Sequence, residues 1–184
     1  MHKNLKKLTL LAVGTALFVV LSLCLQVPVF ENYYLCLGYA VMAVYCYCFG
    51  TAAGTVVGFF GVILYCLVIN GMRGMPGWAL GNIVIGIALG LCYRHTRGMR
   101  SVAARTAIRL AVIVAATALG ILGVKSLTEC LLYAQPFALR VGKNLSAFIA
   151  DAVMLALSEP ICIALERPAR RLFPELCVCG RVDV

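Results

Sequence analysis

The sequence predicts an all-α membrane protein, a bundle of six transmembrane helices with both termini inside the cell. Of its 184 residues, 63% are apolar and only 12% are charged, and the mean hydropathy is +0.99. A soluble domain carries about 25% charged residues. Because a spanning helix needs about 20 apolar residues, residues 1–184 form a single membrane domain with no room for a separate soluble one. Soluble ATPases, Rossmann enzymes and hydrolases are excluded.

The first helix is expected at about residues 8–27. It follows Lys3, Lys6 and Lys7, as the core of a signal peptide would. The apolar stretch is longer than the roughly 7–15 residues of such a core, and no small-x-small cleavage site follows it. Pro28 cannot donate a backbone hydrogen bond and therefore ends the helix.

The next two helices come from one apolar block over residues 33–70. The block is too long for a single pass and suits two, at about 34–49 and 51–70. The reversal is expected at Gly50, because glycine tolerates the backbone angles of a tight turn.

Three further helices follow, each bounded by polar or basic sequence. The fourth is expected at about 78–93 and ends at the arginine-rich stretch 94–100. The fifth is expected at about 103–124 and the sixth at about 143–165. A cytoplasmic tail over 166–184 completes the chain.

The positions of lysine and arginine test this topology. With the N-terminus inside, the inner side carries Lys3, Lys6, Lys7, Arg94, Arg97, Arg100, Arg105, Arg167, Arg170, Arg171 and Arg181. The outer side carries only Arg73, Lys125, Arg140 and Lys143. This asymmetry predicts that both termini are cytoplasmic. The bases also fall in separate patches at membrane boundaries, so the net charge of +9 does not indicate nucleic-acid binding.

The ten cysteines do not predict a disulfide framework. Most lie within apolar runs, where a thiol behaves as a small hydrophobic group. Only Cys36 and Cys130 are candidates for the outer face, so one bridge is conceivable. Cys177 and Cys179 lack the second ligand pair that a zinc site needs, and no metal is expected.

No catalytic constellation is visible in the sequence. The histidines, His2 and His95, are both expected on the cytoplasmic side, and there is no metalloprotease, serine-hydrolase or phosphate-binding motif. The sequence therefore predicts neither an enzyme nor a bound cofactor.

Polar side chains within the apolar helices are the candidates for ligand binding, because such groups are costly in hydrocarbon unless they have a partner or a function. Asn144, Phe148 and Asp151 share one face of the sixth helix, and Trp78 and Asn82 share one face of the fourth. A carboxylate, amides and aromatic rings together suit a polar, planar small molecule. Tyr34 and Glu129 would add to this site from the outer loops.

Each candidate also has a structural explanation. Trp78 and Tyr34 are aromatic residues of the kind that collect at membrane interfaces. Asp151 could pair with a base for structure alone. Lys125 is also a candidate from the outer loops, and its structural explanation is that it extends to the membrane surface.

Two further charged positions are expected to be structural. Arg109, like Arg105 one turn before it, is expected to contact lipid phosphates rather than a partner protein. Glu159, next to Pro160, is expected to mark a kink and a capped turn.

A series of glycine and proline landmarks carries a family resemblance. They are Gly14–Val20, Val27-Pro28, Gly38–Ala43, Phe49–Gly54, Gly58–Gly61, Pro76-Gly77-Trp78, Gly86-x-x-x-Gly90 and the start of the sixth helix near Asn144. In this order and spacing the chain resembles the substrate-binding S components of energy-coupling-factor (ECF) vitamin transporters, particularly the riboflavin-type branch.

The resemblance implies a six-helix subunit in the plasma membrane of a prokaryote that binds a vitamin-like micronutrient at its outer end. Such a subunit docks on a membrane scaffold protein with two cytoplasmic ATPases. Ala12 and Ala16 match the family's Ala-x-x-x-Ala docking pattern; the alternative is that they pack within the bundle. At the end of the third helix, relatives carry polar residues including Asp, whereas this chain has only Asn70. The exact substrate therefore does not transfer, although riboflavin or a related heterocycle is the first candidate.

Two other functions fit a small membrane protein. A stand-alone secondary transporter usually shows paired inverted repeats with broken helices, and no convincing repeat is present. A membrane-embedded enzyme, such as a lipid-modifying one, should place several ionisable residues on one face, and Asp151 alone does not.

Overall fold

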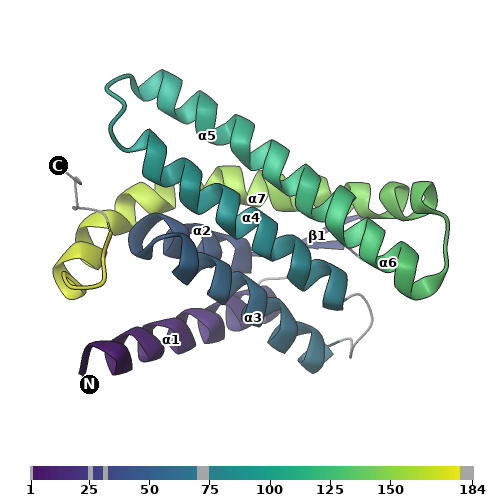
Figure 1. The fold of residues 1–184 in the computed structure, drawn as a ribbon, viewed down its shortest axis with the longest axis horizontal. Coiled ribbons are helices and arrows are strands. Elements are labelled where there is room, and N and C mark those ends of the chain that lie inside the picture. Colours follow the sequence, from purple (N-terminus) through teal and green to yellow (C-terminus); the bar gives the residue numbers. More distant parts are fainter. Residues whose placement is uncertain (1, 25–26, 31–32, 70–74, 179–184) are drawn as a thin grey trace.

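The computed structural model describes the chain over residues 2–24, 27–30, 33–69 and 75–178. Its elements, in chain order, are α1 (His2–Cys24), β1 (Val27–Phe30), β2 (Tyr33–Leu35), α2 (Gly38–Phe49), α3 (Thr51–Ile69), α4 (Met75–Thr96), α5 (Val102–Thr117), η1 (Ala118–Lys125), α6 (Ser126–Tyr133) and α7 (Phe137–Leu172). Figure 1 shows the helices as one bundle, with the start of α1 and the end of α7 on the same side of it. We call this side the termini end and the opposite side, where α6 ends and α7 begins, the α6 end.

The predicted class, a helical multi-pass membrane protein, is confirmed. Five helices are long and apolar enough to span a membrane: α1, α3, α4, the continuous rod formed by α5, η1 and α6, and α7. The remaining helix, α2, has 12 residues and rises about 18 Å, less than the roughly 30 Å of a hydrocarbon core. The six-span count and the orientation remain predictions.

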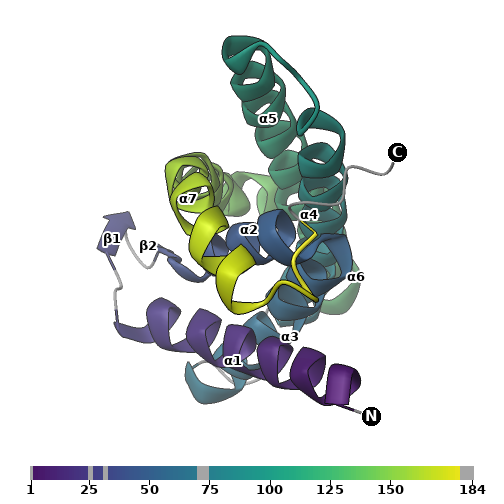
Figure 2. The same cartoon turned by 90° about the vertical axis from the view of Figure 1, so that its left-hand side faces the viewer.

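The helix α2 is the centre of the bundle. Nearly all of its residues are buried, and it packs against α1, α3, α4 and α7, as Figure 2 shows. Its reversal into α3 lies at Gly50, whose φ of 92° is open to glycine and strained for other residues. The turn expected at this glycine is present.

Several helix bounds differ from those expected from hydropathy. The helix expected at 34–49 begins only at Gly38, because residues before it pair as an antiparallel hairpin of β1 and β2. The rod expected to end near residue 124 continues to Tyr133, and α7 extends beyond 143–165 at both ends. Helices do not stop where apolar sequence stops, since Lys, Arg, Glu and Leu are all good helix formers.

A close crossing of α4 with η1 depends on two glycines. A Cβ atom on Gly81 would lie 2.6 Å from the carbonyl oxygen of Gly120, and a Cβ atom on Gly120 would lie 2.8 Å from that of Gly81. Small residues allow helices in lipid to approach in this way. The crossing sets η1, a π-helix, directly against α4, and its last residue is Lys125.

Candidate binding site

A group of polar and aromatic side chains from four segments meets inside the bundle. It consists of Tyr39 of α2, Trp78 and Asn82 of α4, Lys125 of η1 and Asp151 of α7, and we call it the central cluster. Tyr39 and Asn82 are fully buried, and Asp151 is 5% exposed. Buried polar groups cost free energy unless they are hydrogen-bonded, so their contacts with one another stabilise the arrangement.

The hydroxyl group of Tyr39 connects the cluster. The indole Nε1 of Trp78 donates a hydrogen bond to this hydroxyl over 2.8 Å, and the hydroxyl donates to Oδ1 of Asn82 over 2.8 Å. Asn82 in turn donates from Nδ2 to the carbonyl oxygen of Gly58 over 3.1 Å. The carboxyl group of Asp151 contacts the same Tyr39 hydroxyl. Four helices, α2, α3, α4 and α7, are thereby held in register at one point.

Lys125 brings a positive charge to the cluster. Its Nζ lies 5.7 Å from the centre of the Trp78 ring, and the ammonium group interacts with the Asp151 carboxylate. The edge of Tyr65 meets Trp78 with ring centres 5.7 Å apart. Lys125 is half-buried in this setting, which favours its candidacy for the site over the explanation that it merely extends to the membrane surface. The side chain lies in this position because it projects from η1 toward α4 and α7.

A second polar group lies toward the α6 end, and we call it the α6 group. Asn144 donates from Nδ2 to Oγ of Ser126 and to Oε2 of Glu129, both over 3.0 Å. Glu129 also forms an ion pair with Arg140 over 3.5 Å. Arg140 lies over the ring of Tyr133, 4.9 Å from its centre.

The structure thus places the predicted site residues in two neighbouring groups. Trp78, Asn82 and Asp151 meet in the central cluster, whereas Asn144 and Glu129 meet in the α6 group. On α7, Asn144 and Asp151 are both buried, as expected for residues on one face.

The other predicted positions either lie outside both polar groups or have side chains that the structure does not describe. Phe148 is half-buried and packs against the apolar core. Tyr34 lies in β2 opposite Pro28, but its side chain is outside the described part of the chain. Asn70, Arg73, Cys179 and Arg181 also lie outside the described residues. Cys36 and Cys130 are both free thiols in this structure.

Tyr39 is the residue that sequence reasoning missed. It lies in the apolar run Gly38–Ala43. From the sequence alone, a tyrosine in such a run cannot be distinguished from an aromatic residue that only packs in the core. Its partners Trp78 and Asn82 are about 40 residues further along the chain, so no local spacing indicates the contact.

A buried ion pair lies nearer the termini end, in the region between α5 and α7. Arg109 is 2% exposed, and its Nη1 lies 3.1 Å from Oε2 of Glu159. The Arg109 Nε donates to Oγ1 of Thr96 over 2.9 Å, and the guanidinium lies over the rings of Tyr47 and Tyr93. The expectations of a lipid contact for Arg109 and of a capped turn at Glu159 are therefore wrong: each charge supplies the partner that the other needs inside the bundle.

Together, the fold and the central cluster define a multi-pass membrane protein with a buried polar site. Residues 2–166 match the family described as ECF-type riboflavin transporter, S component. The chain belongs to this family, as the resemblance predicted, and the family is one of substrate-binding transporter subunits and not of enzymes.

Curated relatives align over nearly the whole chain. A UPF0397 protein of Streptococcus thermophilus is 25% identical over 176 residues, which cover 92% of this chain and 94% of that protein. A UPF0397 protein of Lactococcus lactis subsp. cremoris is 25% identical over 187 aligned positions, which cover 99% of this chain and 84% of that protein. The similarity therefore includes the segments that carry both polar groups.

Proposed function

We propose that this protein captures a vitamin or related micronutrient at the extracellular side and delivers it inward when docked on an ECF energising module. A riboflavin-like heterocycle is the first candidate ligand. The observation that carries the proposal is the central cluster, in which an indole, a phenol, an amide, a carboxylate and an ammonium group converge from four segments of a family member.

The chemistry of the cluster suits a planar, polar heterocycle. The Asp151 carboxylate accepts hydrogen bonds from ring N–H groups, and the Lys125 ammonium donates to ring carbonyl oxygens. Trp78 offers an aromatic face for stacking. Because Tyr39 and Asn82 are already bonded to neighbouring helices, the site is held in place before the ligand arrives, which lowers the entropic cost of binding.

The α6 group extends this proposed site toward the outer end. Glu129 and Asn144 present further carboxylate and amide groups, and Phe148 adds an aromatic side chain on the same helix as Asp151. Tyr34 is proposed to contribute from β2.

The charge distribution supports a cytoplasmic termini end. Basic side chains described there include Lys6, Lys7, Arg94, Arg97, Arg100, Arg167, Arg170 and Arg171, and an excess of bases marks the inner face of membrane proteins. We propose the plasma membrane of a prokaryote as the location. The α6 end would then face outward, with the site reached from the medium.

The face of α1 supports docking on the scaffold subunit, which would carry two cytoplasmic ATPases. Ala12 and Ala16 are both exposed, whereas Gly14 and Phe18 point into the bundle. Their exposure supports docking over the alternative that they pack within the bundle. Exposed small side chains at i and i+4 form a flat strip that a partner helix can approach closely.

We expect Ala16→Trp to prevent co-purification with the scaffold and its ATPases, because an indole on the strip holds the partner helix away. Affinity capture of the tagged protein from its native membrane measures this. Val114→Trp is the matched control: Val114 is also exposed in a membrane-spanning segment, and α5 lies across the bundle from α1 (Figure 2). Equal recovery of the partners with both variants would contradict docking through this strip.

A ligand panel tests the function directly. Purified protein is heated with riboflavin, other vitamins and related heterocycles, and the unfolding temperature is measured. A ligand present at about 100 times its Kd stabilises the folded state by about 2.7 kcal/mol, so a true substrate raises this temperature clearly. A protein that responds to no member of the panel and co-purifies with no ATPase contradicts the proposal. Substrate uptake without any ATPase would indicate a secondary transporter instead.

A further inference from the structure

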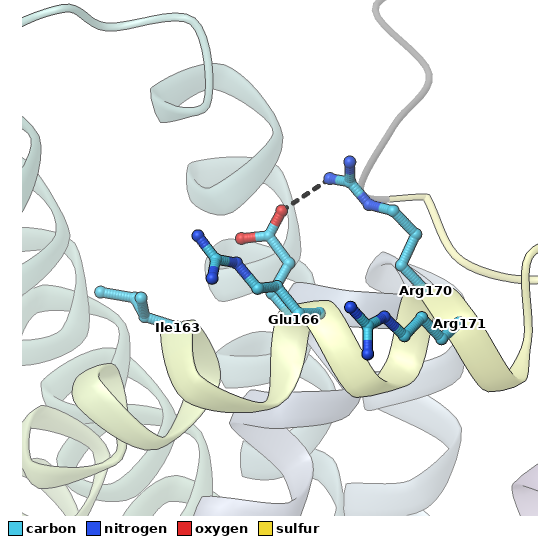
Figure 3. Close-up of a pocket in the computed structure, with 5 residues that line it drawn as sticks. Ile163, Glu166, Arg170 and Arg171 are labelled. Atoms are coloured by element: carbon cyan, nitrogen blue, oxygen red, sulfur yellow. Dashed lines mark hydrogen bonds and ion pairs between the residues drawn. The ribbon is translucent and has the colours of Figure 1, made fainter.

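The last turns of α7 carry a basic hollow that the proposed function does not use. It has a volume of about 460 Å³ and is lined by Ile163, Glu166, Arg167, Arg170 and Arg171. Figure 3 shows these side chains along one side of the helix. All of them except Glu166 are exposed, so a molecule beside the helix can reach them.

One arginine of the hollow is held in place and two are available. Oε1 of Glu166 accepts a hydrogen bond from Arg170 over 2.7 Å, and Oε2 accepts one from the hydroxyl of Tyr47 on α2 over 3.0 Å. Glu166 is thereby fixed against the bundle and its charge is matched by Arg170. Within the described part of the chain, Arg167 and Arg171 form no ion pair. They stand one turn apart, so the hollow has an unmatched positive charge.

The hollow lies where α7 leaves the hydrocarbon. The helix has 36 residues and is about 54 Å long, whereas the hydrocarbon core is about 30 Å thick. On the membrane side of the hollow, α7 exposes the apolar residues Leu157, Ile161 and Ile163. Arg167 and Arg171 follow within two turns. The surface therefore changes from apolar to cationic along the axis of α7.

We propose that this hollow binds the headgroup phosphate of an anionic phospholipid. The guanidinium groups of Arg167 and Arg171 donate to the phosphate oxygens, which their planar fork fits. Ile163 contacts the glycerol and the start of the acyl chains. An acidic protein surface would match the charge alone, whereas a phospholipid matches both the charge and the adjoining apolar face, and so we assign the hollow to lipid.

The test is a lipid titration of the detergent-purified full chain, followed by native mass spectrometry. Phosphatidylglycerol is compared with phosphatidylcholine for the wild type and for R167Q/R171Q. We expect the wild type to bind phosphatidylglycerol first, and the double variant to bind it about 30-fold more weakly, since each of the two bases removed contributes about 1 kcal/mol near the membrane surface. Binding of phosphatidylcholine should not change.

The matched control is R100Q/R105Q, which removes the same charge at the termini end but outside the hollow. An equal loss of phosphatidylglycerol binding in both double variants would overturn the proposal, because net charge alone would then explain it. Equal affinity of the wild type for the two lipids would also overturn the proposal. Displacement of the lipid by millimolar inorganic phosphate would overturn it too, because it would indicate a site for a free anion.

A fourth outcome concerns protein partners. Unchanged lipid binding with loss of the ATPase module would assign the hollow to a protein partner and would also overturn the lipid proposal. The unfolding temperature of each variant without ligand serves as the check on folding, so the lipid test stands whether or not the vitamin panel identifies a substrate.

Discussion

Replacing Asp151 by alanine is expected to abolish ligand binding while the protein still folds in the membrane. The carboxylate is 5% exposed and is the acidic group of the central cluster, facing Tyr39 and Lys125. A hydrogen bond to a charged group contributes about 1.5–3 kcal/mol, and the buried partners on the ligand would be left unpaired. We therefore expect affinity for the ligand found in the panel to fall by about 100-fold or more, measured by isothermal titration.

The fold should survive because Tyr39 keeps its other partners. Its hydroxyl still accepts from Trp78 and donates to Asn82. Removing a buried carboxylate also removes the cost of its desolvation.

Two variants on α7 separate the role of the charge from that of packing. Asp151→Asn keeps the shape and loses the charge, and it should bind almost as poorly as the alanine variant. Ser158→Ala changes a buried group two turns further along, whose hydroxyl donates to the carbonyl of Leu155 in the same helix, and it should bind normally. Unchanged affinity in Asp151→Ala would exclude this residue from the site.

Breaking the Arg109–Glu159 pair should give the largest loss of stability. Arg109→Leu and Glu159→Leu each leave one charge buried without its partner. Removing one member of a buried ion pair costs about 3–5 kcal/mol. We expect each single variant to unfold at a markedly lower temperature in detergent, and to be recovered from the membrane in lower amounts.

The double variant R109L/E159L distinguishes a true pair from two independent contacts. Replacing both charges by apolar groups is often neutral or stabilising, so we expect the double variant to be at least about 2 kcal/mol more stable than the sum of the single changes predicts. Strictly additive losses in the cycle would show that the two charges do not stabilise each other. Thr117→Ala is a useful control, because this buried hydroxyl bonds within its own helix, to Ile113.

Parts of the candidate site could be predicted because they depend on helical spacing. Trp78 and Asn82 at i and i+4 had to share a face of one helix, as did Asn144 and Asp151 at i and i+7. The contacts between helices could not be predicted in this way. For Lys125 the sequence left two roles open, in the site or at the membrane surface. The π-helix η1 decides where its side chain points, and nothing in the neighbouring sequence predicts that helix. The division of the predicted residues between the central cluster and the α6 group likewise follows from packing.

The sequence by itself determined that this chain crosses the membrane several times as helices, that bases collect near its termini, and that it belongs to the ECF S component family. These properties are local or additive along the chain, since hydropathy, charge and landmark spacing can be read without knowing which distant segments come into contact. Only the tertiary structure decided that Tyr39 joins Trp78 to Asn82, that Arg109 is buried against Glu159, and that Ala12 and Ala16 face outward. Hydrogen bonds and ion pairs act over about 3 Å, so they depend on how distant segments pack.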